Sequence, residues 1–283
     1  MLTIRNPLEW LADELKHAGQ HAGEVGHTLR GSAAKPTVNR IAIADLREAL
    51  AKGFEDFGAC RTDVVFLCLI YPIAGLVLAR FATQADFLPL LFPLVSGFAL
   101  IGPIAAVGLY EMSRRRERGA KVSWVDAFGM IGSPSFGAIL ILGFGLLAIF
   151  LLWLFVAQTI YGMTLGPEPP ASFGAFVSNL LTTSAGWTMI VVGMAVGFLF
   201  ALTVLAVSVV SFPMLLDRDV GLGLAVRTSV KALLQNPLPI CAWGLVVVAG
   251  LVIGSIPLFL GLIVVLPVLG HATWHLYRKV VAN

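Results

Sequence analysis

The stretch FGAILILGFGLLAIFLLWLFVAQTIYG, residues 136–162, decides the fold class of this chain. It contains no Asp, Glu, Lys or Arg, and Gln158 is its most polar side chain. A helix needs about 20 predominantly apolar residues to cross the hydrocarbon core of a bilayer, and this run meets that requirement. Because the run is apolar on every side of a helix, it has no face for water and predicts a membrane span.

The composition of the whole chain agrees with this interpretation. Of its 283 residues, 58% are hydrophobic and only 12% are charged, and the mean hydropathy is +0.90. This number of charges is too small to cover the surface of a soluble protein of this length. The apolar surface must therefore face lipid. The net charge of +3 is small and dispersed, so the expected partner is the lipid bilayer and not nucleic acid.

Five further apolar runs of span length flank the first one, at roughly residues 64–82, 87–110, 186–212, 238–256 and 258–277. We therefore predict an all-α fold, a polytopic transmembrane helix bundle of about six spans that occupies residues 63–283. Only a very short turn, Ser255-Ile256-Pro257, separates the last two runs. Residues 238–277 are accordingly either two full spans or one long span with a re-entrant piece.

Basic residues test this layout independently. Six spans put both termini and the loops 111–135 and 213–237 on one side, and these segments hold nearly all the Lys and Arg. The opposite loops, 83–86 and 163–185, contain neither. Arg80 is the exception, and it lies at a helix end where its side chain can reach the interface. Because cytosolic loops carry the excess of basic residues, we predict that both termini are cytosolic.

Amphipathic segments are predicted on the same side. Residues 1–62 form a cytosolic N-terminal region with two apolar stripes of helical spacing, one over Leu8–Leu29 and one over Ile43–Phe57. In the loops, Ser123 and Asp126 have capping-box spacing, and Asp219 is placed to cap a second helix. These surface helices would lie on the inner leaflet with their apolar sides toward lipid.

Small residues mark where helices approach closely. Gly193, Gly197 and Ala201 follow one another at intervals of four, which predicts a packing ridge on the span at 186–212.

His271 and His275 are the candidate metal ligands. They lie four residues apart, so both imidazoles share one helix face, where they could bind a transition metal or ligate haem. Glu111 and Asp217 end the second and fourth predicted spans on the same membrane side, which makes them candidate partners for such a site. The alternative is structural: the histidines hydrogen-bond to neighbouring helices or headgroups, and the carboxylates pair with Arg114, Arg115 or Arg218. In that case no cofactor is bound.

Motifs for catalysis or active transport are missing from the sequence. It has no Walker A motif, no GxSxG elbow and no HExxH, and no predicted span carries a charged residue at its middle. Ion-coupled transporters and pumps usually need such a buried ionisable group. We therefore do not expect an enzyme.

Three motifs carry a resemblance to a known family: GFALIGPIAAVGLYEMSRRRERG (97–119), SFPMLLDRDVGLGLAVRTSVKALLQNP (211–237) and LPVLGHATWHLYR (266–278). Together the chain, over roughly residues 40–280, resembles an uncharacterised family of integral membrane proteins common in proteobacteria. The resemblance implies a multi-span protein of the bacterial inner membrane and no established activity. Some members carry a label relating them to cytochrome c oxidase subunit I, whose haems and copper need histidines on several spans, whereas only one predicted span here carries any.

The function expected from these observations is that of a scaffold, or an assembly or stability factor, for a membrane complex, with a membrane protein as its partner. Two alternatives stay open: a passive transporter or channel for a small or apolar solute, and a haem- or metal-binding membrane protein. The sequence does not specify the oligomeric state.

Overall fold

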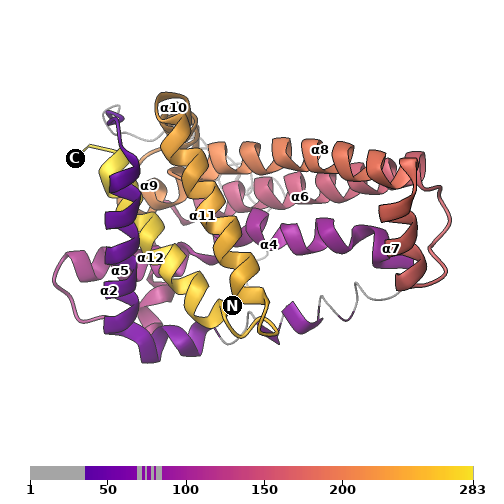
Figure 1. Cartoon of the computed structure of the whole chain (residues 1–283). Coiled ribbons are helices and arrows are strands. Elements are labelled where there is room, and N and C mark those ends of the chain that lie inside the picture. Colours follow the sequence, from indigo (N-terminus) through magenta and orange to yellow (C-terminus); the bar gives the residue numbers. More distant parts are fainter. Residues whose placement is uncertain (1–35, 69–71, 74, 78–79, 81–84, 283) are drawn as a thin grey trace, which may run out of the picture.

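The computed structural model describes residues 36–68, 72–73, 75–77, 80 and 85–282, and the elements named within these residues are all helices, as predicted. In chain order they are α2 (Ile43–Cys68), η1 (Ala85–Leu90), α4 (Leu91–Ala105), α5 (Val107–Glu117), η2 (Trp124–Gly132), α6 (Phe136–Thr164), α7 (Phe173–Thr182), α8 (Ser184–Ser208), α9 (Ser211–Asp217), α10 (Leu222–Gln235), α11 (Pro237–Ser255) and α12 (Leu262–Val280). Figure 1 shows α4, α6 and α8 side by side, with α7 at one end and α2, α5, α9 and α12 gathered at the other.

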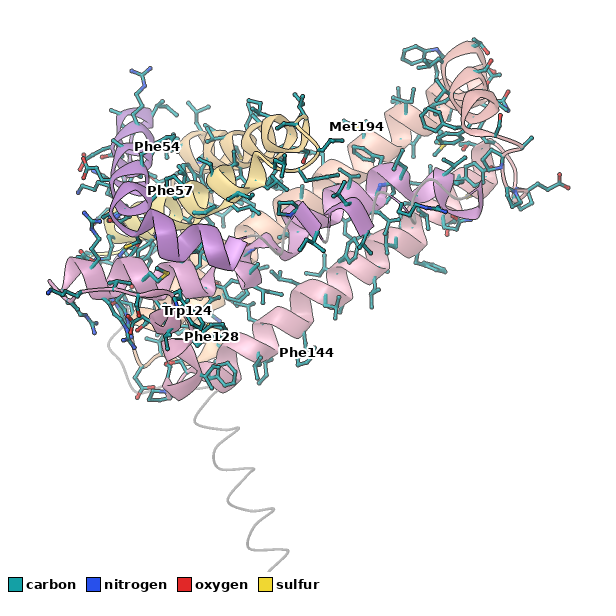
Figure 2. All side chains as sticks on the ribbon, turned by 90° about the horizontal axis from the view of Figure 1, so that it is seen from below. Phe54, Phe57, Trp124, Phe128, Phe144 and Met194 are labelled. Atoms are coloured by element: carbon teal, nitrogen blue, oxygen red, sulfur yellow. The ribbon has the colours of Figure 1, made fainter. Side chains whose placement is uncertain are left out.

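Three described helical stretches are long and apolar enough to cross a membrane: Phe136–Thr164, Ser184–Asp217 and Pro237–Ser255. They coincide with the predicted third, fourth and fifth spans to within a few residues. Large apolar side chains project outward from them, including Phe144, which is 67% exposed, and Met194 (Figure 2). Such surfaces are stable only against lipid or a partner protein.

The first two predicted spans stay predictions. Much of the segment 64–82 lies outside the described residues, as does the predicted amphipathic stripe over 8–29. The second segment, 87–110, is made of η1, α4 and the first turn of α5, with a break at Ala106. Pro103 lies in the last turn of α4. Proline removes a backbone donor and crowds the turn before it, so Pro103 weakens the end of α4.

The helices α11 and α12 form a hairpin. Its turn, residues 256–261, is longer than the predicted one, with Leu258 and Phe259 in the left-handed region at φ 52° and 65°. The two segments of the hairpin pack so closely there that a Cβ added to Gly261 would lie 2.8 Å from Cα of Gly254. Figure 1 shows α11 slanting across the direction of α6 and α8. The helix α11 has the length and apolarity of a span, whereas the second half of α12 is buried against protein and carries polar side chains.

The first half of α2 packs along α12, in the most extensive contact between two elements. Gly53 permits this approach, because a Cβ there would lie 2.7 Å from the carbonyl oxygen of Val268. Leu46 and Ala49 are buried, while Phe54 on the same predicted stripe is 57% exposed. Since α2 continues to Cys68 through a kink at Cys60, the predicted boundary between residues 62 and 63 falls inside a helix.

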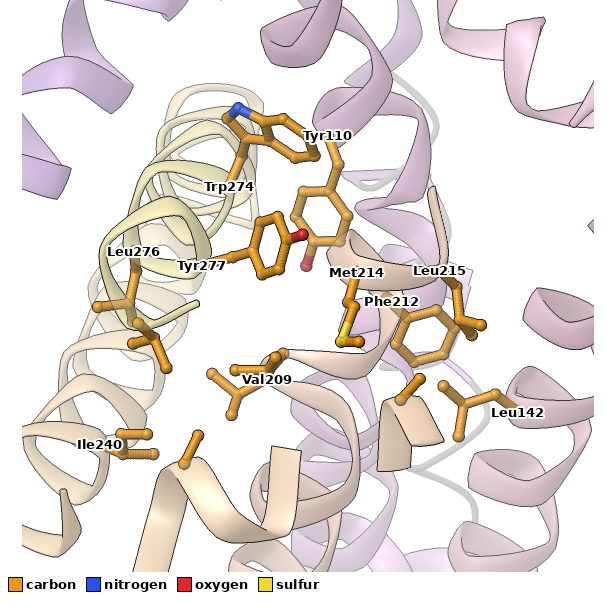
Figure 3. Packing of buried hydrophobic residues seen from close by; sticks show 14 of the residues in the cluster. Tyr110, Leu142, Val209, Phe212, Met214, Leu215, Ile240, Trp274, Leu276 and Tyr277 are labelled. Atoms are coloured by element: carbon orange, nitrogen blue, oxygen red, sulfur yellow. The ribbon is translucent and has the colours of Figure 1, made fainter. Parts of the chain in front are cut away.

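A continuous apolar core joins these parts. Phe212, Met214 and Leu215 of α9 are fully buried at its centre, and Leu142 of α6 packs beside them (Figure 3). Trp274 and Tyr277 of α12 close the core from the other side, with ring centroids 5.5 Å apart. The short helix α9 therefore ties α12 to the apolar helix bundle.

The two predicted surface helices are both present. η2 begins with the predicted capping box: the backbone N–H of Ser123 donates to the Asp126 carboxylate at 2.8 Å. Its apolar residues Trp124 and Phe128 are exposed. The prediction that Asp219 caps α10 is wrong, because the N-cap residue is Gly221 and no side chain caps that end. Asp219 lies too far before the first turn for its carboxylate to act as the N-cap.

Candidate functional site

The α12 helix presents His271 and His275 to α2 and α5. His271 is completely buried, and its Nδ1 lies 2.8 Å from Oγ of Ser113 on α5. The Ser113 hydroxyl donates to the carboxylate of Asp56 on α2 at 2.6 Å. Nε2 of His275 lies 2.9 Å from the same carboxylate oxygen. Four polar side chains from three helices thus form one hydrogen-bonded chain.

Asp56 is the centre of this chain, and Arg116 contributes the full positive charge beside it. Nε of Arg116 lies 3.1 Å from the second carboxylate oxygen of Asp56, which is 6% exposed. Burial raises the pKa of the Asp56 carboxyl, but the hydrogen bonds from His275 and Ser113 outweigh it, so the pKa lies below its usual value. Asp56 therefore stays ionised at neutral pH, which a buried carboxylate can do only when it is well hydrogen-bonded.

Glu111 and Asp217, the proposed partners of the histidines, lie against arginines instead. Glu111 is 1% exposed and accepts from Arg115 Nε at 2.7 Å, while Arg114 Nη2 lies 2.7 Å from its other oxygen. Asp217 accepts from the Tyr277 hydroxyl at 2.9 Å and lies 3.3 Å from Arg278 Nη1 and 3.9 Å from Arg218 Nε. These contacts match the structural alternative, in which the carboxylates pair with cations.

These contacts join α2, α5, η2, α9 and the second half of α12, an ion-paired assembly that we call the charged cap. Arg115 extends it to η2 by binding the Asp126 carboxylate. Lys279 extends it to the start of α2 by reaching Asp45 at 3.0 Å and Glu48 at 2.7 Å. The cap lies at the end of the molecule opposite α7 (Figure 1).

The capacity of the cap for a metal depends on the two imidazoles. Within the described residues, no three His, Cys, Asp or Glu side chains form a group that could hold a metal ion. Nδ1 of His271 and Nε2 of His275 already contact Ser113 and Asp56, whereas Nε2 of His271 is buried without a hydrogen-bond partner. That nitrogen is enclosed by protein, and the metal or haem site itself stays a prediction.

The apolar stretches and the cap together define an all-α integral membrane protein with a polar end. Residues 91–217 match a family model described as "Predicted integral membrane protein (DUF2189)", a family of unknown function. The match runs from α4 to α9 and includes Glu111, Ser113 and Asp217, while Asp56 and both histidines lie outside it. No curated protein and no solved structure matches the chain.

Proposed function

We propose that this protein is a non-enzymatic scaffold, or an assembly or stability factor, for a membrane complex of the bacterial inner membrane. The observation that carries the proposal is that the charged groups of the cap bind one another. Glu111 contacts two arginines, and Asp56 contacts a serine, a histidine and an arginine. Networks of this kind fix the relative positions of helices, because breaking one partner leaves a buried charge uncompensated.

Photo-crosslinking in living cells tests the scaffold proposal. A photoreactive amino acid replaces Phe54 of α2 or Trp124 of η2, which flank the cap, and Phe144 or Met194 serves as the matched control on an apolar helix (Figure 2). We expect one polypeptide to be captured from both cap positions and not from the controls. Its steady-state amount should fall when this chain is deleted. Lipid adducts alone at all four positions would contradict the proposal.

Measurements on the purified protein distinguish this proposal from the two alternative functions. Saturable solute flux in proteoliposomes, with no captured partner, would favour the passive transporter. A Soret band or a stoichiometric metal would favour the haem- or metal-binding protein.

We further propose that the cap is cytosolic, with both termini on that side. Support comes from contacts between basic segments that are far apart in the sequence: Arg118 reaches Asp217 at 3.7 Å, and Arg278 reaches Glu117 at 3.1 Å. Side chains in contact lie on one side of the membrane, and the side richer in Lys and Arg is the cytosolic one. Reporter fusions after residue 283 and within 111–135 should report cytosol, and fusions within 163–185 should report periplasm. A periplasmic C-terminus would contradict this orientation.

A further inference from the structure

A cavity of about 600 Å³ opens in the cap, and the described residues that line it are all charged: Arg114, Glu117, Arg118, Asp217, Arg218 and Arg278. Four arginines face two carboxylates, and Arg114 is also paired with the buried Glu111 behind the lining, so the formal charge of the group is +1. These residues come from the ends of α5, α9 and α12, so three helix ends converge on one concave, cationic surface. The buried histidine network is separate, because none of its four members lines the cavity.

The carboxylates of the lining do not saturate its arginines. Asp217 lies 3.3 Å from Arg278 Nη1, 3.7 Å from Arg118 Nη2 and 3.9 Å from Arg218 Nε. Close charge-assisted hydrogen bonds measure about 2.7–2.9 Å, so one carboxylate is shared loosely among three cations. Each guanidinium presents five N–H donors, and Arg278 is also held by Glu117, whose Oε1 lies 3.1 Å from its Nε.

Other contacts hold the arginines in place. Arg218 donates to the carbonyl oxygen of Ala282 at 2.6 Å, and Arg114 donates to that of Leu216. The side chains of Arg114, Arg218 and Arg278 are only 19%, 23% and 25% exposed. Partly buried cations that are already held in place attract an anion more strongly than solvated ones. Water screens their charge less, and their side chains lose little conformational entropy when the anion binds.

We propose that this cavity binds a phosphate group, carried either by an acidic phospholipid or by a soluble phosphate compound. Forked guanidinium groups match the oxygens of phosphate, which makes arginine the preferred residue for such recognition. The cavity lies at the end of an apolar helical stretch, since Arg218 directly follows Asp217, where that stretch ends. Basic pockets at the ends of membrane helices are typical sites for anionic headgroups.

Thermal unfolding of the full chain in micelles tests the proposal. One arm adds phosphatidylglycerol to phosphatidylcholine-doped micelles, and the other adds inorganic phosphate, both at constant ionic strength. Arg118→Gln is the main variant, because Arg118 is 61% exposed and its loss disturbs the fold least. Arg278→Gln is the second. Lys231→Gln, an exposed residue of α10 outside the cavity, removes the same charge and is the matched control.

We expect a saturable rise in the melting temperature of the wild type, with an apparent affinity roughly tenfold weaker in Arg118→Gln and unchanged in Lys231→Gln. Dependence on phosphatidylglycerol but not on phosphate identifies the source as lipid, and an equal response to phosphate identifies a soluble compound. No rise with either probe overturns the proposal. So does a rise of equal affinity in the wild type and Arg118→Gln, because it would reflect general charge attraction.

Discussion

Oγ of Ser113 lies 2.8 Å from Nδ1 of His271, a contact between residues 158 positions apart in the chain. It joins α5, which lies inside the matched family segment, to α12 beyond that segment. The same hydroxyl donates to Asp56 on α2 at 2.6 Å, so one serine connects three helices. Because Ser113 is 1% exposed, water cannot replace these bonds if the hydroxyl is removed.

Ser113→Ala should therefore destabilise the protein although it removes a single oxygen atom. The change leaves His271 Nδ1 and one bond of the Asp56 carboxylate unsatisfied in a buried site, which costs about 1–3 kcal/mol. The measurement is the melting temperature in detergent, with Ser178→Ala on the exposed face of α7 as control. We expect the control to stay within about 0.5 kcal/mol of the wild type. Equal melting temperatures for both variants would contradict the role assigned to Ser113.

The stability that Asp56 supplies should depend on pH. Its pKa is lower in the folded state than in the unfolded chain, so its contribution is full above the ordinary carboxyl pKa of about 4 and is lost as the pH falls through the folded value. Asp56→Asn lacks this ionisation. The difference in stability between the wild type and Asp56→Asn should be greatest near neutral pH and should narrow below about pH 4.

Urea or thermal unfolding at several pH values measures this difference, and comparison with the variant cancels the titration of other carboxylates. His271, His275 and Arg116 face Asp56, so all three must be kept in both proteins. A difference in stability between the wild type and Asp56→Asn that widens at acidic pH would mean that burial, and not hydrogen bonding, dominates the Asp56 pKa.

The apolar helices could be predicted from the sequence alone, whereas the residues that contact the two histidines could not. The run 136–162 reappears as Phe136–Thr164, because an uninterrupted apolar segment has only one stable form in a bilayer. The capping box at Ser123 is equally local and is confirmed. His275 contacts Asp56 across 219 positions. No local pattern specifies that α2 lies along α12, so Asp56 and Ser113 could not be recognised as neighbours of the two histidines.

Glycine positions test the packing of the apolar helices. A Cβ added to Gly197 would lie 3.1 Å from Cη2 of Trp153, whereas one added to Gly193 would meet nothing within 4 Å. Trp153 cannot withdraw easily, because its Nε1 donates to Ser96 at 3.1 Å and its ring packs on Phe200 at 5.4 Å.

Gly197→Leu should therefore destabilise the bundle by about 1–3 kcal/mol through overpacking, and Gly193→Leu should change little. The two variants add the same side chain to the same helix, one turn apart, so they differ only in what the side chain meets. Melting temperatures in detergent measure the effect. Equal losses for the two leucines would indicate that the ridge does not pack as the structure describes.

The role of His275 can be tested with a side chain that keeps a nitrogen near the position of Nε2 but lacks the imidazole ring. Glutamine places its amide near the position of Nε2, so His275→Gln can still donate to Asp56, whereas His275→Ala cannot. If His275 only joins helices, His275→Ala should lose about 1.5–3 kcal/mol, as expected for a hydrogen bond to a charged group, and His275→Gln should lose less than half of that. A metal or haem iron needs the imidazole itself, so both variants would then lose the ligand equally. Metal analysis and the absorption spectrum of the purified proteins, recorded beside their melting temperatures, separate the two outcomes. We expect stability to follow the retained hydrogen bond, and a bound metal or Soret band that disappears from both variants would contradict that expectation.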